Sequence, residues 1–433
     1  MFIPSFFARR VMRGAVAAAL CALIAAGAHG APALDFEQAL RLAGERSQQP
    51  VALTAAVAAA RERAVAAGQL PDPVLKLGVN NLPISGSGQF DFGREAMTSR
   101  SIGFAQSFTR EDKRHARAGR YEREAEAAQA QRALVQIEVR REAAMAWFER
   151  HYLERKLALL QALRDETALQ VHAAQAVYRG GGGAQSDVFG ARSALAQMDN
   201  RIVQAGSERA ASAVRLSRWT GEPEQRPLGA SPDIASPPLA QASLDARFAA
   251  HPQLVLLQRR EALAEAEADI ARSERRADWS AEVMYSQRGS DYADMVSFNV
   301  SIPLQFDRAN RQDRELAARL SGVDQIRAER DEAARAYLAQ ARAWLLGWQG
   351  NRERLRRYDE TLIPLAADRV QAALAAYRGG AGSLSGVLEA RSAEIDTRIG
   401  HLNVELETAL LWARLRYLFA DGDDTHSTTE VRP

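Results

Sequence analysis

Catalysis and metal binding need reactive side chains at defined spacings, and this sequence offers few of them. The seven histidines are scattered, and none lies at ligand spacing from a cysteine or from another histidine. The sequence has no phosphate-binding Gly-Lys-Ser/Thr loop, no metalloprotease helix motif and no nucleophile elbow. Asp421, Asp423, Asp424 and His426 could bind a cation weakly, but a solvated acidic tail is the simpler interpretation. We therefore expect no enzyme activity, no metal site and no cofactor.

A repeat of the chain is far more informative than any single side chain. Residues 178–193 (YRGGGGAQSDVFGARS) return as residues 377–392 (YRGGAGSLSGVLEARS) at a constant offset of 199 residues, and ten positions are identical. This period is much longer than the roughly 20–50 residues of a solenoid repeat. The chain is therefore expected to contain two copies of one structural unit.

The N-terminus and the charge balance indicate where the chain works. Three arginines in residues 9–13, an apolar stretch over residues 15–26 and a cleavage site at Ala28-His-Gly30 before Ala31 predict a secretory signal peptide over residues 1–30. The only cysteine, Cys21, lies inside it. Without these three arginines the chain has 53 basic and 54 acidic residues. This balance offers no basic surface for nucleic acid.

Each copy contains a pair of segments with strand-like alternation, residues 74–108 and residues 279–305. Apolar residues occupy one face of these strands and small polar residues the other, although Gln106 breaks the apolar face. After the signal no apolar run approaches the roughly 20 residues of a membrane helix, so only a closed β-barrel could cross a bilayer. A lone hairpin is unstable in water. The strands therefore need partners from the other copy and from other protomers.

Long helices are expected around these hairpins, because apolar residues recur at intervals of three and four and the chain is rich in Ala, Arg, Glu and Leu. Each long helix has about 70 residues and would span roughly 100 Å. Glycines then reverse the chain into a shorter return helix. The predicted first copy covers residues 31–220 and contains a helix interrupted near Pro50, the hairpin 74–108, the long helix 111–179 and the return helix 184–219. After a Pro-rich linker over residues 221–243, the second copy covers residues 244–420 and contains a helix interrupted at Pro252, the hairpin 279–305, the long helix 309–378 and the return helix 383–419. Residues 421–433 are predicted to be a disordered polar tail.

This duplicated order of strand pair, long helix, glycine turn and half-length helix after a signal peptide resembles the TolC-like outer-membrane efflux proteins. The most specific pieces are the two Tyr-Arg-Gly-Gly turns, and residues 301–308 (SIPLQFDR) are similar to another family signature. The run over residues 108–114 resembles the heavy-metal branch, for cobalt, zinc and cadmium or for copper. The resemblance implies a homotrimer with four strands per protomer in a 12-stranded transmembrane β-barrel. It also implies a periplasmic α-barrel with the glycine turns at its inner end.

The resemblance also implies functional positions. Asp187 and Tyr377 match positions at which the family places gate residues, and Glu389 matches a position that lines the constriction. Three copies of Glu389 would form a ring of carboxylates that could filter cations. For all three residues an ordinary helix-start, packing or surface role is the alternative. The sequence departs from the pattern at Gly386, where some relatives carry an acid, and at Gly382, where some carry a basic residue.

A second implied surface would dock a periplasmic membrane-fusion adaptor. Exposed turns with neighbouring apolar residues suit packing against another helical hairpin. A plain reversal of the chain is the alternative. The residues implied in docking are Gly180, Gly181, Gly183, Val188, Arg192, Gly379, Gly380, Gly382, Val387, Leu388 and Arg391.

The function implied is an exit duct in the outer membrane of a Gram-negative cell, with most of the chain in the periplasm. It would serve a tripartite RND-type efflux system, with the adaptor and an inner-membrane transporter as partners and heavy-metal cations as cargo. A duct for drugs or for type I protein secretion is the alternative within the family. A soluble periplasmic coiled-coil adaptor or scaffold is the alternative of another class, but an adaptor is expected to have one hairpin and a compact β domain.

Overall fold

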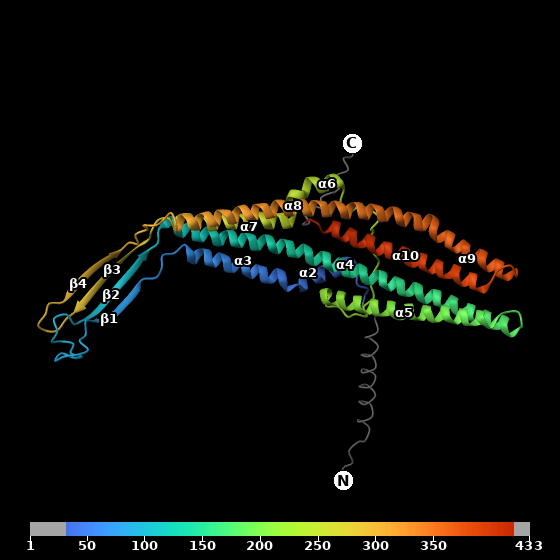
Figure 1. Cartoon of the computed structure of the whole chain (residues 1–433), viewed down its shortest axis with the longest axis horizontal. Coiled ribbons are helices and arrows are strands. Elements are labelled where there is room, and N and C mark those ends of the chain that lie inside the picture. Colours follow the sequence, from blue (N-terminus) through green and yellow to red (C-terminus); the bar gives the residue numbers. More distant parts are fainter. Residues whose placement is uncertain (1–31, 420–433) are drawn as a thin grey trace, which may run out of the picture. The chain divides into compact units, whose positions relative to one another are not determined.

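The chain is mainly helical and contains one small antiparallel sheet (Figure 1), which confirms this part of the predicted fold class. The computed structural model describes residues 32–419, so the predicted signal peptide and the predicted tail lie outside the described residues. The chain forms two compact units. Unit 1 comprises the chain up to Arg46, Glu142–Ala235 and Arg354–Ala409, and unit 2 comprises Ser47–Arg141, Ser236–Glu353 and the chain from Leu410.

In unit 2, strands from both copies form a single four-stranded sheet in the order β1-β2-β3-β4, and every neighbouring pair is antiparallel. The central pair β2–β3 joins the two copies, with Phe104 opposite Val283. The last strand ends at Ser301, not at residue 305 as predicted, because Pro303 has no backbone N–H to donate to a ladder. The strands are β1 (Val74–Asn80), β2 (Ser99–Phe108), β3 (Trp279–Gln287) and β4 (Met295–Ser301).

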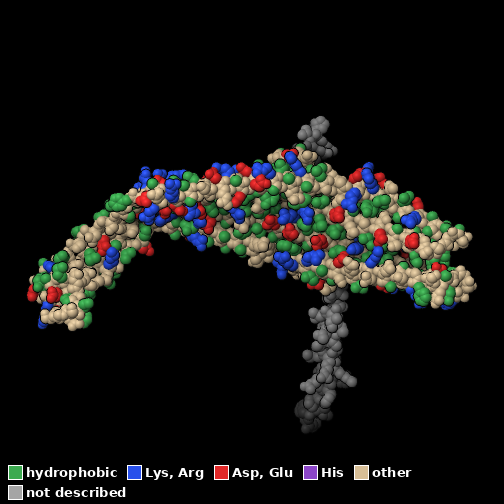
Figure 2. All heavy atoms as spheres, viewed as in Figure 1, with side chains coloured by type: hydrophobic (Ala, Val, Ile, Leu, Met, Phe, Trp, Pro, Cys, Tyr) green, Lys and Arg blue, Asp and Glu red, His purple; other side chains and the backbone are tan. Residues whose placement is uncertain are grey.

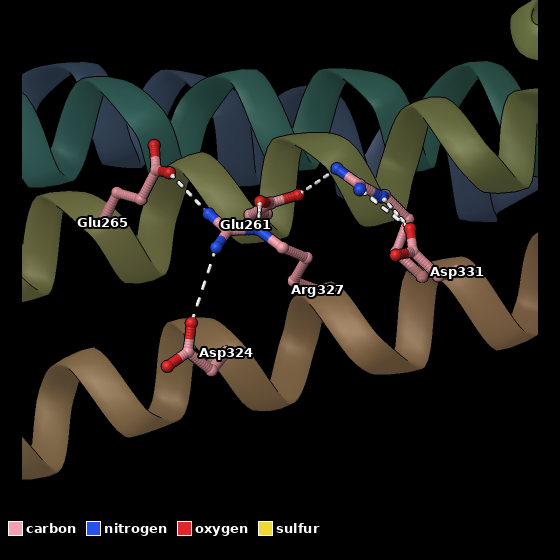
Figure 3. A network of polar contacts seen from close by, with 6 residues as sticks. Glu261, Glu265, Asp324, Arg327 and Asp331 are labelled. Atoms are coloured by element: carbon pink, nitrogen blue, oxygen red, sulfur yellow. Dashed lines mark hydrogen bonds and ion pairs between the residues drawn. The ribbon is translucent and has the colours of Figure 1, made fainter.

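Helices α3 (Gln48–Ala67) and α7 (Pro252–Ser273) precede the two strand pairs, and helices α4 (Glu111–Arg179) and α8 (Gln312–Arg357) follow them. A buried carboxylate connects α7 to α8 (Figure 3). Glu261 is only 7% exposed, and it accepts hydrogen bonds from Arg327, at 2.9 Å, and from Arg330. Two further carboxylates hold Arg327: Glu265 at 3.6 Å and Asp324 at 3.4 Å. Two guanidinium groups thus neutralise the one acid that lies inside this helix pair.

A second joint lies where the sheet meets the helices. The carboxylate of Asp278, next to β3, accepts hydrogen bonds from the backbone N–H of Arg110 at 3.1 Å and from Lys113 Nζ at 2.9 Å. Beside it, the rings of Phe108 and Trp279 stack with centroids 4.2 Å apart. These contacts tie the end of β2 to the start of β3.

The predicted interruption at Pro252 is the start of α7. A short helix α6 (Gln241–Arg247) and a 3₁₀ turn η1 (Phe248–Ala250) precede it, so the helical structure begins three residues inside the predicted linker. His251 is the N-cap, and proline fits the first position of a helix because its missing N–H has no intrahelical partner there. A hydrophobic core forms around this turn from Leu239, Leu244, Phe248, Leu254, Ala341, Leu418 and Phe419.

In unit 1, the linker is irregular but firmly attached to the start of the chain. Leu34 donates its N–H to Pro227 O at 2.7 Å and accepts from Gly229 N at 3.1 Å. Arg150, with a side chain 2% exposed, donates to the carbonyl of Arg226 at 2.6 Å. Helix α2 (Phe36–Arg46) packs its Phe36 ring edge-on against Trp147 at 5.5 Å.

Two antiparallel helical pairs complete unit 1 (Figure 1): α4 with α5 (Gln185–Thr220), and α9 (Ile363–Arg378) with α10 (Leu384–Arg416). The second long helix is not continuous as predicted, since a π-helical turn, η2 (Tyr358–Leu362), separates α8 from α9. The reason is Pro364, which cannot donate to residue 360 and whose ring would meet that carbonyl in a regular α-helix. Widening the preceding turn relieves the clash.

Candidate functional site

The two glycine turns have nearly identical backbones. In the first, Gly181 has φ +77°, and its N–H donates to Tyr178 O at 3.1 Å. In the second, Gly380 has φ +74° and donates to Tyr377 O at 3.1 Å. Residues with a side chain rarely adopt this left-handed conformation, so both positions favour glycine. The glycines named from the sequence, at 180, 181, 183, 379, 380 and 382, lie in these turns, and all are exposed except Gly183, which is half-buried.

A single apolar cluster lies beneath both turns and joins the two hairpins. It includes Val171 and Ala174 of α4, Val188 and Ala191 of α5, and Leu384 and Val387 of α10. Tyr377 and Leu388 pack against it and are half-buried. The structure therefore buries Val188 and Val387, named from the sequence as docking residues, because each faces the other hairpin within the chain. Phe189 is one of the exposed apolar side chains here, at 57% exposed, and the comparison of the two copies did not single it out.

The two return helices begin with different chemistry. In the first copy, the carboxylate of Asp187 accepts from Ala184 N at 3.4 Å, and Asp187 N donates to Ala184 O at 3.1 Å. In the second copy, Gly386 replaces the acid, and Ser383 Oγ accepts from Gly386 N at 3.2 Å. Asp187 therefore serves as a helix-start residue, and a negative charge there is favourable.

The two equivalent arginines lie in different environments. Arg192 of α5 is exposed. Arg391 of α10 has a side chain only 19% exposed, and it pairs with Glu166 at 3.0 Å and with the buried Glu394 at 2.8 Å. Arg391 therefore holds α10 against α4, whereas Arg192 faces solvent.

Glu389 is exposed at the edge of a pocket of about 290 Å³ formed by α4, α5 and α10. Gly190, at the position equivalent to Glu389, lines the same pocket, and a side chain there would meet nothing closer than Leu388 Cδ1 at 3.8 Å. Arg201 and Arg391 also line it. Within residues 32–419 no three His, Cys, Asp or Glu side chains are grouped so that they could hold a metal ion.

The sheet has two chemically different faces. On one face, Leu77, Phe104, Phe298 and Val300 are exposed by 72%, 59%, 77% and 66%. On the other face the residues are mostly small or polar, and Lys76 Nζ lies 2.6 Å from Glu282 Oε2. In Figure 2 charged side chains of both signs are interspersed over the helices, whereas the visible side of the sheet carries few. Over residues 32–419 no helix has the length and apolar character needed to cross a bilayer.

Part of this chain matches the model of a known protein family, and several solved structures have a similar fold. Residues 39–222 match the family model described as outer membrane efflux protein. The outer-membrane channel OprN has a TM-score of 0.73 at 16% identity, covering 89% of this chain and 90% of that chain. VceC, an outer membrane protein of Vibrio cholerae, has a TM-score of 0.71 at 15% identity, with 89% and 96% covered. CusC has a TM-score of 0.74 at 16% identity, with 90% and 93% covered. No curated protein sequence matches this chain.

Proposed function

We propose that this chain, whose residues 39–222 belong to the outer membrane efflux protein family, is the outer-membrane exit duct of a tripartite RND-type efflux system that exports heavy-metal cations. The observation that carries the proposal is the four-stranded sheet, which exposes an apolar face and a small polar face in a chain that otherwise consists mainly of long helices.

The apolar face suits contact with lipid. Side chains such as Leu77, Phe104, Val283 and Phe298 would cost free energy in water, at roughly 25 cal/mol per Å² of apolar surface. The edge strands β1 and β4 also present unpaired backbone groups, which a bilayer does not tolerate. Three protomers would pair β4 of one with β1 of the next and close a barrel of 12 strands, which removes every edge.

The polar face suits a water-filled lumen. Its residues are small along the middle of β2, where Ser101, Gly103 and Ala105 follow one another on that face. Lys76 and Glu282 then place one positive and one negative charge over these small residues. An interior of this kind hydrates ions and polar solutes without blocking their passage.

The glycine turns would meet the adaptor, and the exposed side chains near them include Arg192 and Phe189. Asp187, Tyr377 and Glu389 would form the gate region. Glu389 is the best placed of the three to contact cargo, because it is exposed while Asp187 and Tyr377 are half-buried. A threefold ring of Glu389 carboxylates would favour cations over anions.

Two experiments test this function. Membrane fractionation should recover the chain in the outer membrane as an oligomer that heating dissociates. Recovery in the soluble periplasm would instead support the adaptor or scaffold alternative. Deletion of the gene should then lower tolerance to zinc, cobalt, cadmium or copper. Unchanged metal tolerance with increased drug sensitivity would support a drug duct, and loss of a secreted polypeptide would support type I secretion.

A further inference from the structure

A pocket lies between the end of α7 and the start of α8, where unit 2 passes from the sheet to its helices (Figure 1). Its volume of about 350 Å³ is at the small end of the roughly 300–1,000 Å³ range of ligand sites. Ala271 and Glu274 line it from the end of α7, and Arg311, Gln312 and Glu315 line it from the start of α8. Four of these five side chains are polar, so an occupant is recognised mainly by charge and by hydrogen bonds.

One end of the pocket has hydrogen-bond acceptors that the chain does not fill. The side-chain oxygen of Gln312 is buried and accepts no hydrogen bond. Glu315 is paired with Arg319, at 2.9 Å, but the carboxylate of Glu274 forms no ion pair within residues 32–419. A buried acceptor without a donor costs free energy, so an occupant with N–H donors is favoured. Two carboxylates and an amide oxygen together suit a primary ammonium group, which has three donors and a positive charge.

The other end of the pocket is positive. Arg311 is exposed, and in the part of the chain that the structure describes its guanidinium group forms no ion pair. A guanidinium group matches the geometry of a phosphate, with which it forms paired hydrogen bonds. A simple anion would be repelled by Glu274 and Glu315, and a simple cation by Arg311. The lining therefore favours a small zwitterion with an ammonium and a phosphate group.

Apolar side chains are exposed on the segment that leads from β4 to α8. Ile302, Leu304 and Phe306 are exposed by 59%, 69% and 90%, and we call them the apolar ridge. They occupy every second position after the end of β4 and so continue the alternation of the apolar strand face, which includes Phe298 and Val300. Exposure of this much apolar surface to water is unfavourable, so the ridge suits contact with hydrocarbon.

A hydrogen bond holds the apolar ridge beside the pocket. The side-chain amide of Gln305, which lies within the ridge segment, donates to the backbone carbonyl of Glu274 at 3.0 Å. Glu274 also lines the pocket, so the polar and apolar surfaces are neighbours. A molecule with a zwitterionic head and a hydrocarbon tail could contact both at once. A phospholipid with a phosphoethanolamine headgroup has this chemistry.

The first copy of the repeat does not have the same residues. At the offset of 198 residues that relates Phe108 to Phe306, the three pocket residues of α8 correspond to Lys113, Arg114 and Arg117. All three are basic, and they would repel an ammonium group. Phe108 is also stacked on a ring of β3, whereas Phe306 is almost fully exposed. The chain therefore has one such site, and it belongs to the second copy.

We propose that this pocket binds the phosphoethanolamine headgroup of a membrane phospholipid. The ammonium group lies among Glu274, Gln312 and Glu315, the phosphate lies at Arg311, and the acyl chains lie along the apolar ridge. The inference rests on the proposed function, which places the sheet in the outer membrane, and adds a specific lipid on the helix side of the bilayer. A lipid bound at this junction fixes the depth of the sheet in the membrane.

Native mass spectrometry of the purified full-length protein tests the choice of headgroup. The delipidated protein is titrated with phosphatidylethanolamine, phosphatidylcholine and phosphatidylglycerol that carry the same acyl chains. The choline group has no N–H to donate, and the glycerol headgroup has no cation. We expect phosphatidylethanolamine to bind up to one molecule per chain, and about tenfold more tightly than the other two, because only its ammonium makes charge-assisted hydrogen bonds.

Variants locate the binding. The double variant E274Q/Q312L should remove most of the preference for phosphatidylethanolamine over phosphatidylcholine. The control E111Q changes an exposed acid at the start of α4, outside the pocket, and should keep the preference. F306S should weaken binding of all three lipids to a similar extent, because their acyl chains are the same.

The unchanged protein already decides the main point, so the test does not depend on the folding of a variant. Equal affinity for the three lipids, or a preference for phosphatidylglycerol, would overturn the proposal. Displacement of the lipid by an equal concentration of free phosphoethanolamine would show that the site takes a soluble zwitterion instead. An unchanged preference in E274Q/Q312L would place the lipid elsewhere, and unchanged binding in F306S would refute the role of the ridge.

These outcomes are separate from the proposed function. In each of them the chain is still an outer-membrane oligomer, so the exit duct stands without the specific lipid. Recovery of a soluble chain that binds none of the three lipids would instead refute the proposed function itself.

Discussion

His251 Nδ1 accepts a hydrogen bond from the backbone N–H of Gln253 at 3.3 Å, and this bond caps helix α7 with a neutral imidazole. The ring also stacks on Tyr337 with centroids 5.3 Å apart, and its edge meets Phe419. Burial lowers the pKa of His251 to about 4, and the positive charge of Arg141 acts in the same direction. Protonation of this residue therefore opposes folding of unit 2.

A pH dependence follows with a defined sign. Because the folded pKa of about 4 lies below the ordinary value of 6.5, the unfolded chain takes up the proton first as pH falls. The contribution to stability is complete above about pH 6.5 and is lost between there and pH 4, with a magnitude on the order of 2–3 kcal/mol. We expect the variant H251N, which keeps an N-cap side chain but does not titrate, to lose less stability over this range. Equal losses of unfolding free energy in both proteins would contradict the assignment.

The buried Glu261 should be important for the stability of the α7–α8 pair. Replacing it with Gln removes the charge that Arg327 and Arg330 neutralise and leaves two guanidinium groups together. We expect E261Q to lower the unfolding free energy by about 2–4 kcal/mol. The control is E265Q, at the exposed edge of the same network, where the side chain is 55% exposed and about 0–1 kcal/mol is at stake. Chemical denaturation of the purified proteins measures both, and similar effects would refute the special role of Glu261.

The glycine turns offer a matched pair of substitutions. Gly380 has φ +74°, whereas its neighbour Gly379 has φ −80°. We expect G380A to cost roughly 1–2 kcal/mol because alanine is strained in the left-handed region. G379A should cost clearly less. A thermal midpoint that falls equally in the two variants would show that the turn does not require this conformation.

Charge at the proposed constriction can be changed in both directions. E389Q should reduce the preference of the purified channel for cations, measured as a reversal potential across a planar bilayer under a salt gradient. G190E should increase this preference, because it adds the equivalent acid of the first copy at a position with space for a side chain. Reversal potentials that stay constant in both variants would remove Glu389 from the conduction path.

The fold class was predictable because its signals are local. Alternation at Val74–Asn80 and Met295–Ser301 indicates strands, long runs spaced by three and four indicate helices, and the paired glycines indicate reversals. Which strands pair across the copies was not predictable, because the β2–β3 register depends on residues about 180 positions apart. The hydrogen bonds between Leu34 and the linker were not predictable either, because they also join residues that are far apart in the sequence.

The candidate site was harder to predict than the fold. Val188 and Val387 look like surface residues beside a turn, but they are buried because the two hairpins pack on each other there. Arg192 and Arg391 both lie in an Ala-Arg-Ser sequence, which does not reveal that only Arg391 is half-buried and paired with Glu166 and Glu394. Comparison of the two copies in sequence selects residues that are identical in both copies or that differ between them. The structure instead draws attention to Phe189, which is exposed although its equivalent Leu388 is half-buried.

The π-helical turn explains a small irregularity in the duplication itself. Phe108 and Arg110 recur as Phe306 and Arg308 at an offset of 198 residues, whereas Tyr178 recurs as Tyr377 at an offset of 199. The second copy therefore contains one additional residue between these points, where η2 lies. In a regular α-helix an extra residue would rotate everything beyond it by about 100°. The wide turn absorbs that rotation, so Val370 stays buried as its equivalent Val171 does. Residues beyond the turn therefore lie on the same side of the helix in both copies, although the second copy is one residue longer.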